Sequence, residues 1–329
     1  MIHTRDQDNN VLKELLSQKL LWWVVFDIGI SGAFNSVVTM ILECYRSILL
    51  ENNIILIVGY NQIEFSFLKV LREIFPTRKI YVYQLEQLYW YNYNCFDFGS
   101  SKGIVMNTTI RIDNRLNHAD AIWWYDLDNI GFLQSLWYQA PSWIPMLHAH
   151  TLQREKLDSD KDIDVLFYWS LNFARIKALH YLIHELNIKV QIIGKPFSGG
   201  INEEAKKLLV DLEPYRIDSI YTEDIWTYIA RSKIILNLHF YESHLQEQVR
   251  LFELLINNKC IVSQKSRRNY YGSLIYEFEW YEEMVTMIDQ ILTSWKRQNT
   301  KHLSWDFENI STTFVKEGKR IVDWITMYW

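Results

Sequence analysis

Short runs of apolar and β-branched residues alternate with longer stretches of helical periodicity along most of this chain. Residues 54–58 form one such run, and a stretch of helical period at 63–74 separates it from the next run at 79–83. The alternation returns in the second half, where the run 163–168 precedes a helical stretch over 174–186. Strands and helices in this order build βαβ units and parallel sheets. The sequence therefore predicts an α/β fold with two doubly wound, Rossmann-like domains.

The best boundary between the two predicted domains lies within residues 141–162. Two prolines and a charged stretch interrupt both periodicities there, and the segment is expected to bury little. We therefore expect an N-terminal domain over 1–150, a C-terminal domain over 151–300 and a closing helix over 301–329 that packs across them. Two such domains would face a central cleft. The other expected strands are 22–27, 119–124, 188–192, 233–240 and 259–263, and the other expected helices are 34–50, 130–138, 203–211, 225–231 and 245–257.

Composition excludes several classes of protein. The 329 residues include only 11 glycines and 5 prolines, which excludes collagen-like and broadly disordered chains. The formal net charge of −5 argues against a broad basic surface, so no nucleic-acid partner is expected. The three cysteines form no CxxC pair, which favours a reducing compartment without a zinc site. Because Asp27 interrupts the apolar run 20–30, we expect no signal or membrane segment and a cytoplasmic protein.

A group of charged residues follows the predicted strand 233–240. Glu247, Arg250 and Glu253 recur three residues apart, which would place them on one polar face of the predicted helix over 245–257. A carboxylate near a helix start can bind ribose hydroxyls, while an arginine and the helix N-terminus bind phosphate. The alternative interpretation is an exposed helix face with an ordinary ion pair.

Several segments, in the same order along the chain, resemble motifs of the GT-B glycosyltransferases of the group 1, CgeB-like kind. The segment 165–175 reads VLFYWSLNFAR and resembles a strand, loop and helix start of bacterial glycosyltransferase-like proteins. The segment 237–242 reads NLHFYE, and RLFE at 250–253 precedes an apolar strand, as in the same group. Residues 83–88 and 122–126 resemble two further segments of its N-terminal half.

The resemblance implies a GT-B fold and an enzyme that transfers a sugar from a nucleotide sugar to a glycan, glycolipid or lipid-linked acceptor, as in polysaccharide biosynthesis. The C-terminal domain would hold the nucleotide sugar. Neither cofactor nor metal is implied, because basic side chains and helix N-termini stabilise the leaving diphosphate. A lipid-linked acceptor would bring the protein to a membrane surface. The residues that the resemblance and the strand ends assign to the nucleotide sugar are Arg175, Lys195, His239, Glu242, Glu247, Arg250 and Glu253.

These residues have different expected roles. Arg250, Arg175 and Lys195 would stabilise the leaving group, although Arg175 could equally be an ordinary residue at a helix start. Glu253 is the first candidate for binding the ribose or the donor sugar, and Glu247 is the second. Two further side chains, His239 and Glu242, lie at a strand end and could contact sugar hydroxyls or phosphate, whereas a lone histidine is more often structural.

An inverting transferase also needs a general base for the acceptor hydroxyl. The candidates in the N-terminal half are Asp27, at the end of the first expected strand, and Glu86. Asp27 precedes a loop with two glycines at 29–32, and the alternative is a simple strand-to-helix turn. Asp126 and Asp128 have the spacing of a DxD metal motif, but we expect them to cap a helix rather than hold a metal.

The chain departs from the family pattern at three positions, and the first two of them motivate alternative functions. Trp169 stands where the pattern has glycine, so the loop is bulkier at the expected diphosphate position. Leu245 occupies the position at which a retaining-type carboxylate pair with Glu253 would need its partner. Asn258 replaces a glycine after the helix, where Asn tolerates a left-handed conformation. The alternatives are a sugar-nucleotide-binding or scaffold protein without catalysis, and a glycosyltransferase that modifies nucleic acid or protein. Aromatic residues over 89–96 could line an acceptor site or form an interaction loop.

Overall fold

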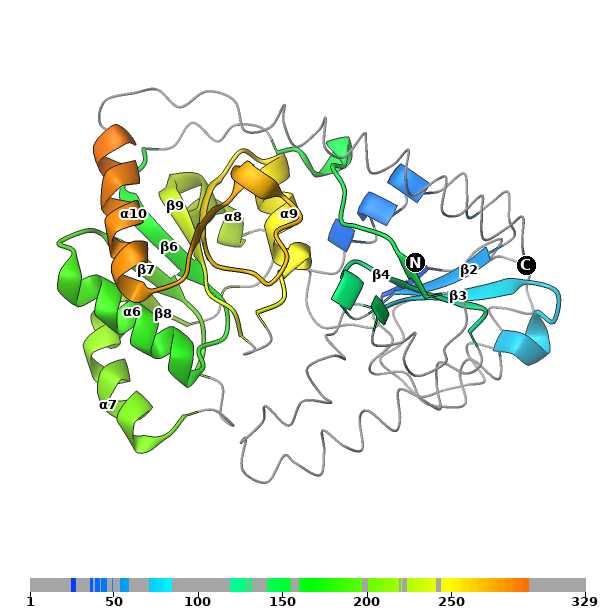
Figure 1. Ribbon diagram of the computed structural model, residues 1–329, viewed down its shortest axis with the longest axis horizontal. Coiled ribbons are helices and arrows are strands. Elements are labelled where there is room, and N and C mark those ends of the chain that lie inside the picture. The colour runs from blue at the N-terminus through cyan, green and yellow to red at the C-terminus, as the bar shows by residue number, and fades with distance from the viewer. Residues whose placement is uncertain are drawn as a thin grey trace. The chain divides into compact units, whose positions relative to one another are not determined.

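The computed structural model divides the chain into two compact units, Met1–Leu152 with Ser311–Trp329, and Gln153–Ile310. Figure 1 shows the elements of each unit, and each unit is described by itself. No helix among the described residues is long and apolar enough to cross a membrane. The structure describes residues 25–27, 54–58, 71–84, 119–131, 141–154, 160–196, 201–218, 224–240 and 244–295, with single-residue gaps, and parts of 36–49.

The first unit contains a parallel sheet whose central strands are continuous apolar runs. Such runs are typical of strands that are buried on both faces, and Trp123 and Trp124 are fully buried here. The described strands lie side by side in sequence order, which differs from the reversed order of a doubly wound sheet. They are β1 (Val25–Asp27), β2 (Ile54–Val58), β3 (Lys79–Gln84), β4 (Ala121–Trp124) and β5 (Pro141–Trp143).

The expectation that residues 141–162 bury little is wrong for the first part of that segment. Pro141 opens the edge strand β5, whose register pairs it with Ile122 of β4. A proline is tolerated at the start of an edge strand because its missing N–H is not needed by a second neighbour. Ile144 and Leu147 then lie fully buried. The boundary between the units falls after Leu152.

The second unit contains a six-stranded parallel sheet in the order β11-β10-β9-β6-β7-β8. Counted in chain order this is 3-2-1-4-5-6 from the β8 edge, which is the order of a doubly wound nucleotide-binding sheet. The order reverses between β6 and β9, and ligands of such sheets bind beyond the carboxyl ends of the strands at this point. The strands are β6 (Ile163–Tyr168), β7 (Val190–Ile193), β8 (Arg216–Ile217), β9 (Ser232–Asn237), β10 (Cys260–Gln264) and β11 (Tyr276–Phe278).

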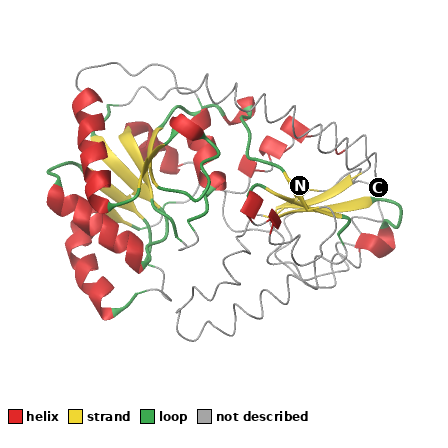
Figure 2. Ribbon diagram, in the orientation of Figure 1, coloured by secondary structure: helices red, strands yellow, loops and turns green. Residues whose placement is uncertain are grey.

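Helices cover both faces of this second sheet, as Figure 2 shows. On one face, the apolar side chains of α6, α7 and α10 join those of the strands in one core, which includes Phe167, Leu179 and Ile288. The α/β class and the parallel sheets predicted from the sequence are confirmed. The helices are α6 (Phe173–Glu185), α7 (Glu203–Leu212), α8 (Asp224–Arg231), α9 (Gln248–Ile256) and α10 (Tyr281–Trp295).

Two details of α9 bear on the site. The helix begins at Gln248 with Glu247 as its N-cap residue, a few residues after the start predicted at 245. Asn258, just beyond its C-terminus, has a φ of +55°, which confirms the left-handed conformation expected for this asparagine. The closing helix predicted over 301–329 and the aromatic segment 89–96 lie outside the described residues.

Candidate functional site

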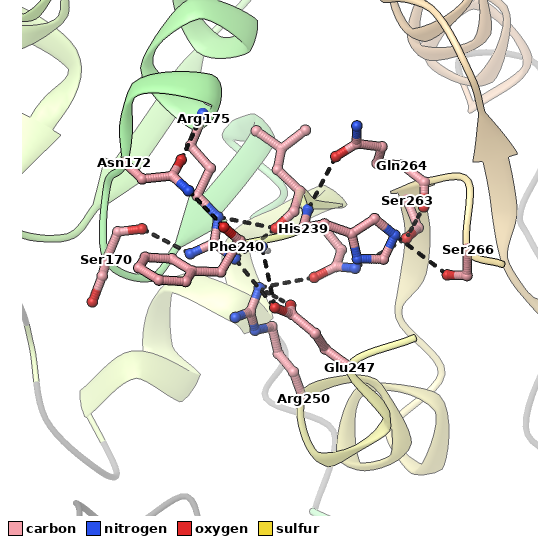
Figure 3. A network of polar contacts seen from close by, with 12 residues as sticks. Ser170, Asn172, Arg175, His239, Phe240, Glu247, Arg250, Ser263, Gln264 and Ser266 are labelled. Carbon is pink, nitrogen blue, oxygen red and sulfur yellow. Dashed lines mark hydrogen bonds and ion pairs between the residues drawn. The ribbon is translucent and has the colours of Figure 1, made fainter. Parts of the chain in front are cut away.

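Polar contacts concentrate where β6 and β9 end, at the reversal of strand order in the second sheet (Figure 3). Asn172, the N-cap residue of α6, connects the two strand ends. Its Oδ1 accepts a hydrogen bond of 2.9 Å from the backbone N–H of Arg175, and its Nδ2 donates one of 2.7 Å to the carbonyl of Phe240. One side chain thus starts α6 and fixes the chain after β9 beside it.

Arg175 is completely buried beneath these loops. Its Nε and Nη2 donate to the carbonyl oxygen of Leu238 at 3.0 and 2.6 Å, and its Nη1 donates to that of Ser170 at 2.8 Å. These donors are therefore committed to the loops after β6 and β9. This guanidinium positions the two loops, as expected for a structural residue at a helix start, and its contact with a leaving group stays a prediction.

Glu247 joins two arginines into one buried network. Its Oε2 lies 2.7 Å from Arg250 Nη1, and its Oε1 lies 3.5 Å from Arg175 Nη2. Burial raises the pKa of the Glu247 carboxyl, but the charges of Arg250 and Arg175 lower it more, and the net pKa lies below the usual value. Glu247 is therefore ionised at neutral pH. Two guanidinium groups and one carboxylate leave this network with an excess of one positive charge.

Arg250 places part of this positive charge at the end of β9. Its Nη1 also donates to Asn237 Oδ1 at 2.9 Å, and its side chain is 7% exposed. Its Nε is buried and has no hydrogen-bond partner among the described residues. The guanidinium lies 4.2 Å from the ring centroid of Trp169. The polar helix face predicted for Glu247 and Arg250 is thus buried in the site rather than exposed to solvent.

Trp169 covers Arg250 while its backbone lies against the neighbouring strand end. A Cβ placed on Gly194 would lie 1.9 Å from the carbonyl oxygen of Trp169, so residue 194 has to be glycine for the two loops to approach this closely. Trp169 as a whole residue is 37% exposed. The indole of Trp169 is the bulky group expected at this position. It stacks on the guanidinium of Arg250, and part of the ring is exposed to solvent.

His239 lies buried behind this network, and only 5% of it is exposed. Its Nε2 is 3.4 Å from Ser266 Oγ, and its Nδ1 has no partner in the described part of the chain. Burial lowers the pKa of His239 to about 4, although the charge of Glu247 partly opposes this. His239 is thus neutral at neutral pH, and its contact with a sugar hydroxyl or phosphate stays a prediction.

The titration of His239 predicts that the second unit loses stability between pH 6.5 and pH 4. The ordinary pKa of about 6.5 applies in the unfolded chain, so on acidification the unfolded state binds the proton before the folded state does. This contribution to stability is complete above pH 6.5 and declines until about pH 4. The two pKa values correspond to a loss of about 3 kcal/mol.

Urea unfolding of wild type and His239→Gln over this pH range measures the effect. The variant is expected to show a shallower dependence of unfolding free energy on pH, because carboxylates titrate in both proteins whereas only wild type has the buried imidazole. Val210→Gln, at an exposed residue of α7 that does not titrate, is the control and should keep the wild-type slope. Equal slopes in wild type and His239→Gln would contradict the prediction.

The other predicted residues of the second unit lie beside the network. Lys195 follows β7, its carbonyl accepts a 2.9 Å hydrogen bond from the N–H of Leu171, and its exposed side chain makes no ion pair with any described residue. Glu253 lies one turn after Arg250 and forms an ion pair of 3.3 Å with Arg154. The side chain of Glu253 is 15% exposed.

Three candidates fall wholly or partly outside the described residues. Glu86 and Glu242 are not described, and Asp27 is described only as the last backbone residue of β1.

Asp126 Oδ1 accepts a hydrogen bond of 3.0 Å from the N–H of Asp128, which is the local capping contact expected for this pair.

The end of β10 contributes residues that the sequence analysis did not assign to the site. Ser263 Oγ accepts from Asn237 Nδ2 at 3.0 Å, and Gln264 Oε1 accepts from the backbone N–H of His239 at 3.2 Å. The sequence feature that could have identified them is the change from apolar to polar residues at the end of the predicted strand 259–263. These side chains brace the strand ends from the other side.

The division into two α/β units and the order of the second sheet fit the GT-B fold. Among solved structures, the chain is similar to the Anabaena protein HepE in complex with UDP and glucose. The TM-score is 0.59 at 12% identity, and the match covers 92% of this chain and 98% of HepE. For HepE in complex with UDP-glucose, the TM-score is 0.57 at 12% identity, with 93% and 99% covered.

A second similar structure is a variant of S. aureus TarM in complex with Fondaparinux, alpha-GlcNAc-glycerol and UDP. Its TM-score is 0.50 at 13% identity, and the match covers 82% of this chain. The chain spans about half of the length of TarM. Comparisons with protein-family models and with curated protein sequences find no match. The similarity is thus one of fold, at an identity too low to carry residue roles.

Proposed function

We propose that the protein is a glycosyltransferase that binds a nucleotide sugar at the carboxyl ends of β6 and β9. The observation that carries this proposal is the excess positive charge of Arg175, Glu247 and Arg250 at the strand-order reversal of a doubly wound sheet. A diphosphate is the anionic part of every nucleoside diphosphate sugar, and such sheets bind nucleotides at this place. The complexes of HepE with UDP and UDP-glucose support a uridine nucleotide as the first class to test.

The leaving diphosphate would be stabilised by the chain's own charges. Arg250 has an Nε–H that meets no acceptor in the described part of the chain, and it lies at the end of β9, while Lys195 follows β7 with an exposed side chain. The N-terminus of α6, which Asn172 caps, adds a partial positive charge at the same edge of the sheet. Because these groups supply the positive charge, we propose that transfer needs no metal ion or cofactor.

In the proposed reaction, the oxygen of an acceptor hydroxyl forms a bond to the anomeric carbon of the sugar. The bond from that carbon to the diphosphate oxygen breaks, and the nucleoside diphosphate leaves with the electron pair. The hydroxyl proton passes to a carboxylate of the N-terminal unit, for which Asp27, at the carboxyl end of β1, is the first candidate and Glu86 the second. Glu253 and Glu242 are proposed to bind the ribose or the donor sugar.

The acceptor is proposed to be a glycan or a lipid-linked sugar, held by the N-terminal unit. This assignment extends the resemblance of the N-terminal segments, and it places the protein in polysaccharide biosynthesis in the cytoplasm. Binding of a lipid-linked acceptor would bring the chain to a membrane surface. An acceptor panel with soluble glycans and with detergent-dispersed glycolipids distinguishes the two acceptor classes.

A binding and turnover experiment tests the proposal. The purified chain is titrated with UDP, GDP, ADP and UDP sugars in EDTA, and donor hydrolysis or transfer is followed by release of the nucleoside diphosphate. We expect one nucleotide to raise the unfolding midpoint by a few degrees at about 100 times its dissociation constant. The sugar form of that nucleotide should be turned over in EDTA. If no nucleotide binds, the proposed nucleotide site is contradicted.

The second candidate function is a sugar-nucleotide-binding protein without catalysis. It is favoured by one observation, the stacking of Trp169 over Arg250, which covers the cation that would meet the leaving group. Nucleotide binding without release of the nucleoside diphosphate, in the presence of the acceptor panel, would support this candidate over the transferase.

A further inference from the structure

A cluster of three side chains on the outer helices of the second unit is independent of the proposed nucleotide site. Helices α6 and α7 lie side by side on one face of the sheet (Figure 1). His180 and His184, one helical turn apart on α6, meet Asp211 near the C-terminus of α7. His180 Nε2 lies 3.0 Å from Asp211 Oδ2 and 3.0 Å from His184 Nε2, and His184 Nε2 lies 4.0 Å from Asp211 Oδ2.

Hydrogen bonds alone do not account well for the short distances between these three side chains. A ring nitrogen carries either a proton or a lone pair. If His180 Nε2 carries a proton, it must share one hydrogen between the Asp211 carboxylate and His184 Nε2. If it carries a lone pair, it faces the carboxylate with no hydrogen between them. A cation at the centre would attract the lone pairs of all three atoms at once.

The spacing of the three atoms suits a small transition-metal ion. Atoms separated by 3.0, 3.0 and 4.0 Å lie on a circle with a radius of about 2.0 Å, and metal–ligand distances to imidazole nitrogen and carboxylate oxygen are about 2.0–2.2 Å. From its centre, the two ring nitrogens lie about 97° apart and His184 lies almost opposite Asp211. Angles near 90° and 180° are those of square-planar and octahedral ions.

The solvent exposure of the cluster leaves room for the remaining ligands. The side chain of His180 is 23% exposed, and those of His184 and Asp211 are 56% and 52% exposed. Water can therefore complete the coordination sphere, and an ion can enter without any movement of the backbone. Imidazole and carboxylate together suit Cu²⁺, Ni²⁺ and Zn²⁺, and Cu²⁺ binds such ligands most tightly among these ions.

We propose that His180, His184 and Asp211 form a binding site for a divalent transition-metal ion that connects α6 to α7. This ion is not part of the transfer chemistry. His184 lies about 18 Å along the α6 axis from Asn172, at a rise of 1.5 Å per residue, and Asn172 marks the nucleotide end of the helix. Because the ligands come from two helices that are separate in the unfolded chain, binding would stabilise the folded second unit.

The test uses the full chain after removal of metal with a chelator. Calorimetric titration with Cu²⁺, Ni²⁺ and Zn²⁺ is expected to show a binding event that His184→Gln, Asp211→Asn and the double variant His180→Gln/His184→Gln weaken by at least about tenfold. Loss of a second-shell group already costs about 10–100-fold, so loss of a ligand should cost at least as much. Mg²⁺, which prefers oxygen ligands, should not bind at this site.

The matched control is Glu204→Gln, which removes an exposed carboxylate two turns away on α7 and should leave the affinity unchanged. Electron paramagnetic resonance of the Cu²⁺ complex supplies a second readout, since coupling to two imidazole nitrogens is expected in wild type and not in the double variant. Unchanged affinity and unchanged nitrogen coupling in the double variant would overturn the site. Nucleotide binding in EDTA reports on the proposed function separately, so failure of one proposal does not mask the other.

Discussion

An Arg175→Met variant is expected to lose about 3–5 kcal/mol of unfolding free energy, the largest stability effect that the structure predicts for a single side chain. Removal of the guanidinium leaves two carbonyl oxygens without their donors, at a cost of about 1–3 kcal/mol each. It also takes the second cation from Glu247, which keeps Arg250 at 2.7 Å. Arg175 is fully buried, and its guanidinium also satisfies the carbonyl oxygens of Leu238 and Ser170. In the variant, both carbonyl oxygens would lack a hydrogen-bond donor, and the negative charge of Glu247 would have one cation less beside it. Urea unfolding, followed by far-UV circular dichroism, measures the change as a lower midpoint.

Two further variants test the reason for this loss. Lys177→Met, at an exposed position of the same helix, is expected to stay near the wild-type midpoint. Adding Glu247→Gln to Arg175→Met should cost less than the sum of the two single changes, because the carboxylate that Arg175 compensated is gone. If Arg175→Met and Lys177→Met unfold at the same urea concentration, Arg175 does not hold the two strand ends together.

The strands that the sequence predicts best are those buried on both faces. Residues 54–58 and 163–168 were predicted with the bounds that the structure gives, since an uninterrupted apolar run ending at polar residues marks a central parallel strand. The two-residue strand β8 and the edge strand β5 gave no such signal. Short edge strands owe their conformation to the neighbour that they pair with, and a single sequence does not reveal that neighbour.

The residues of the site were easier to predict than their surroundings. The spacing of Glu247 and Arg250 allowed an ion pair as the alternative interpretation, and the structure has this pair at 2.7 Å, whereas nucleotide binding by the two residues stays a prediction. Their burial was not predictable, because it depends on a helix that starts only after Glu247 and on Arg175, which another helix brings in from 72 residues earlier in the chain. Similarly, the H-x-x-x-H spacing of His180 and His184 is visible in the sequence, whereas the position of Asp211 depends on how α7 packs on α6.

The sheet order explains why residues so far apart in sequence gather at one place. Strands β6 and β9 are neighbours only because the chain first builds β7 and β8 on one side and then returns to the other. The loops after β6 and β9 therefore lead in opposite directions and leave their ends uncovered by a crossover helix. Asn172 and Arg175 fill the space between these ends with hydrogen bonds, and Arg250 is the cation that this arrangement brings to the reversal point.

Arg250→Ala is expected to lower the turnover number of the proposed transfer by about 10²–10³. Removal of one group that stabilises the charge developing in a transition state costs about 2.7–4 kcal/mol. Arg250 lies at the end of β9, and its Nε–H has no acceptor among the residues that the structure describes, which makes it the first candidate for this role. Either variant leaves Glu247 one arginine partner, but only Arg175→Met also removes the donors of two backbone carbonyl oxygens, so the loss of stability should be smaller for Arg250→Ala.

Steady-state kinetics and unfolding of the same preparations separate catalysis from folding. The loss in Arg250→Ala should fall mainly on kcat, because the leaving group acquires its additional charge only on the way to the transition state. Lys195→Ala removes an exposed ammonium group that forms no ion pair with a described residue, so its effect should be smaller and reduced by salt. A kcat for Arg250→Ala within twofold of wild type, in a protein that still binds the nucleotide, would show that Arg250 acts only in the ion-pair network and that another cation meets the leaving group.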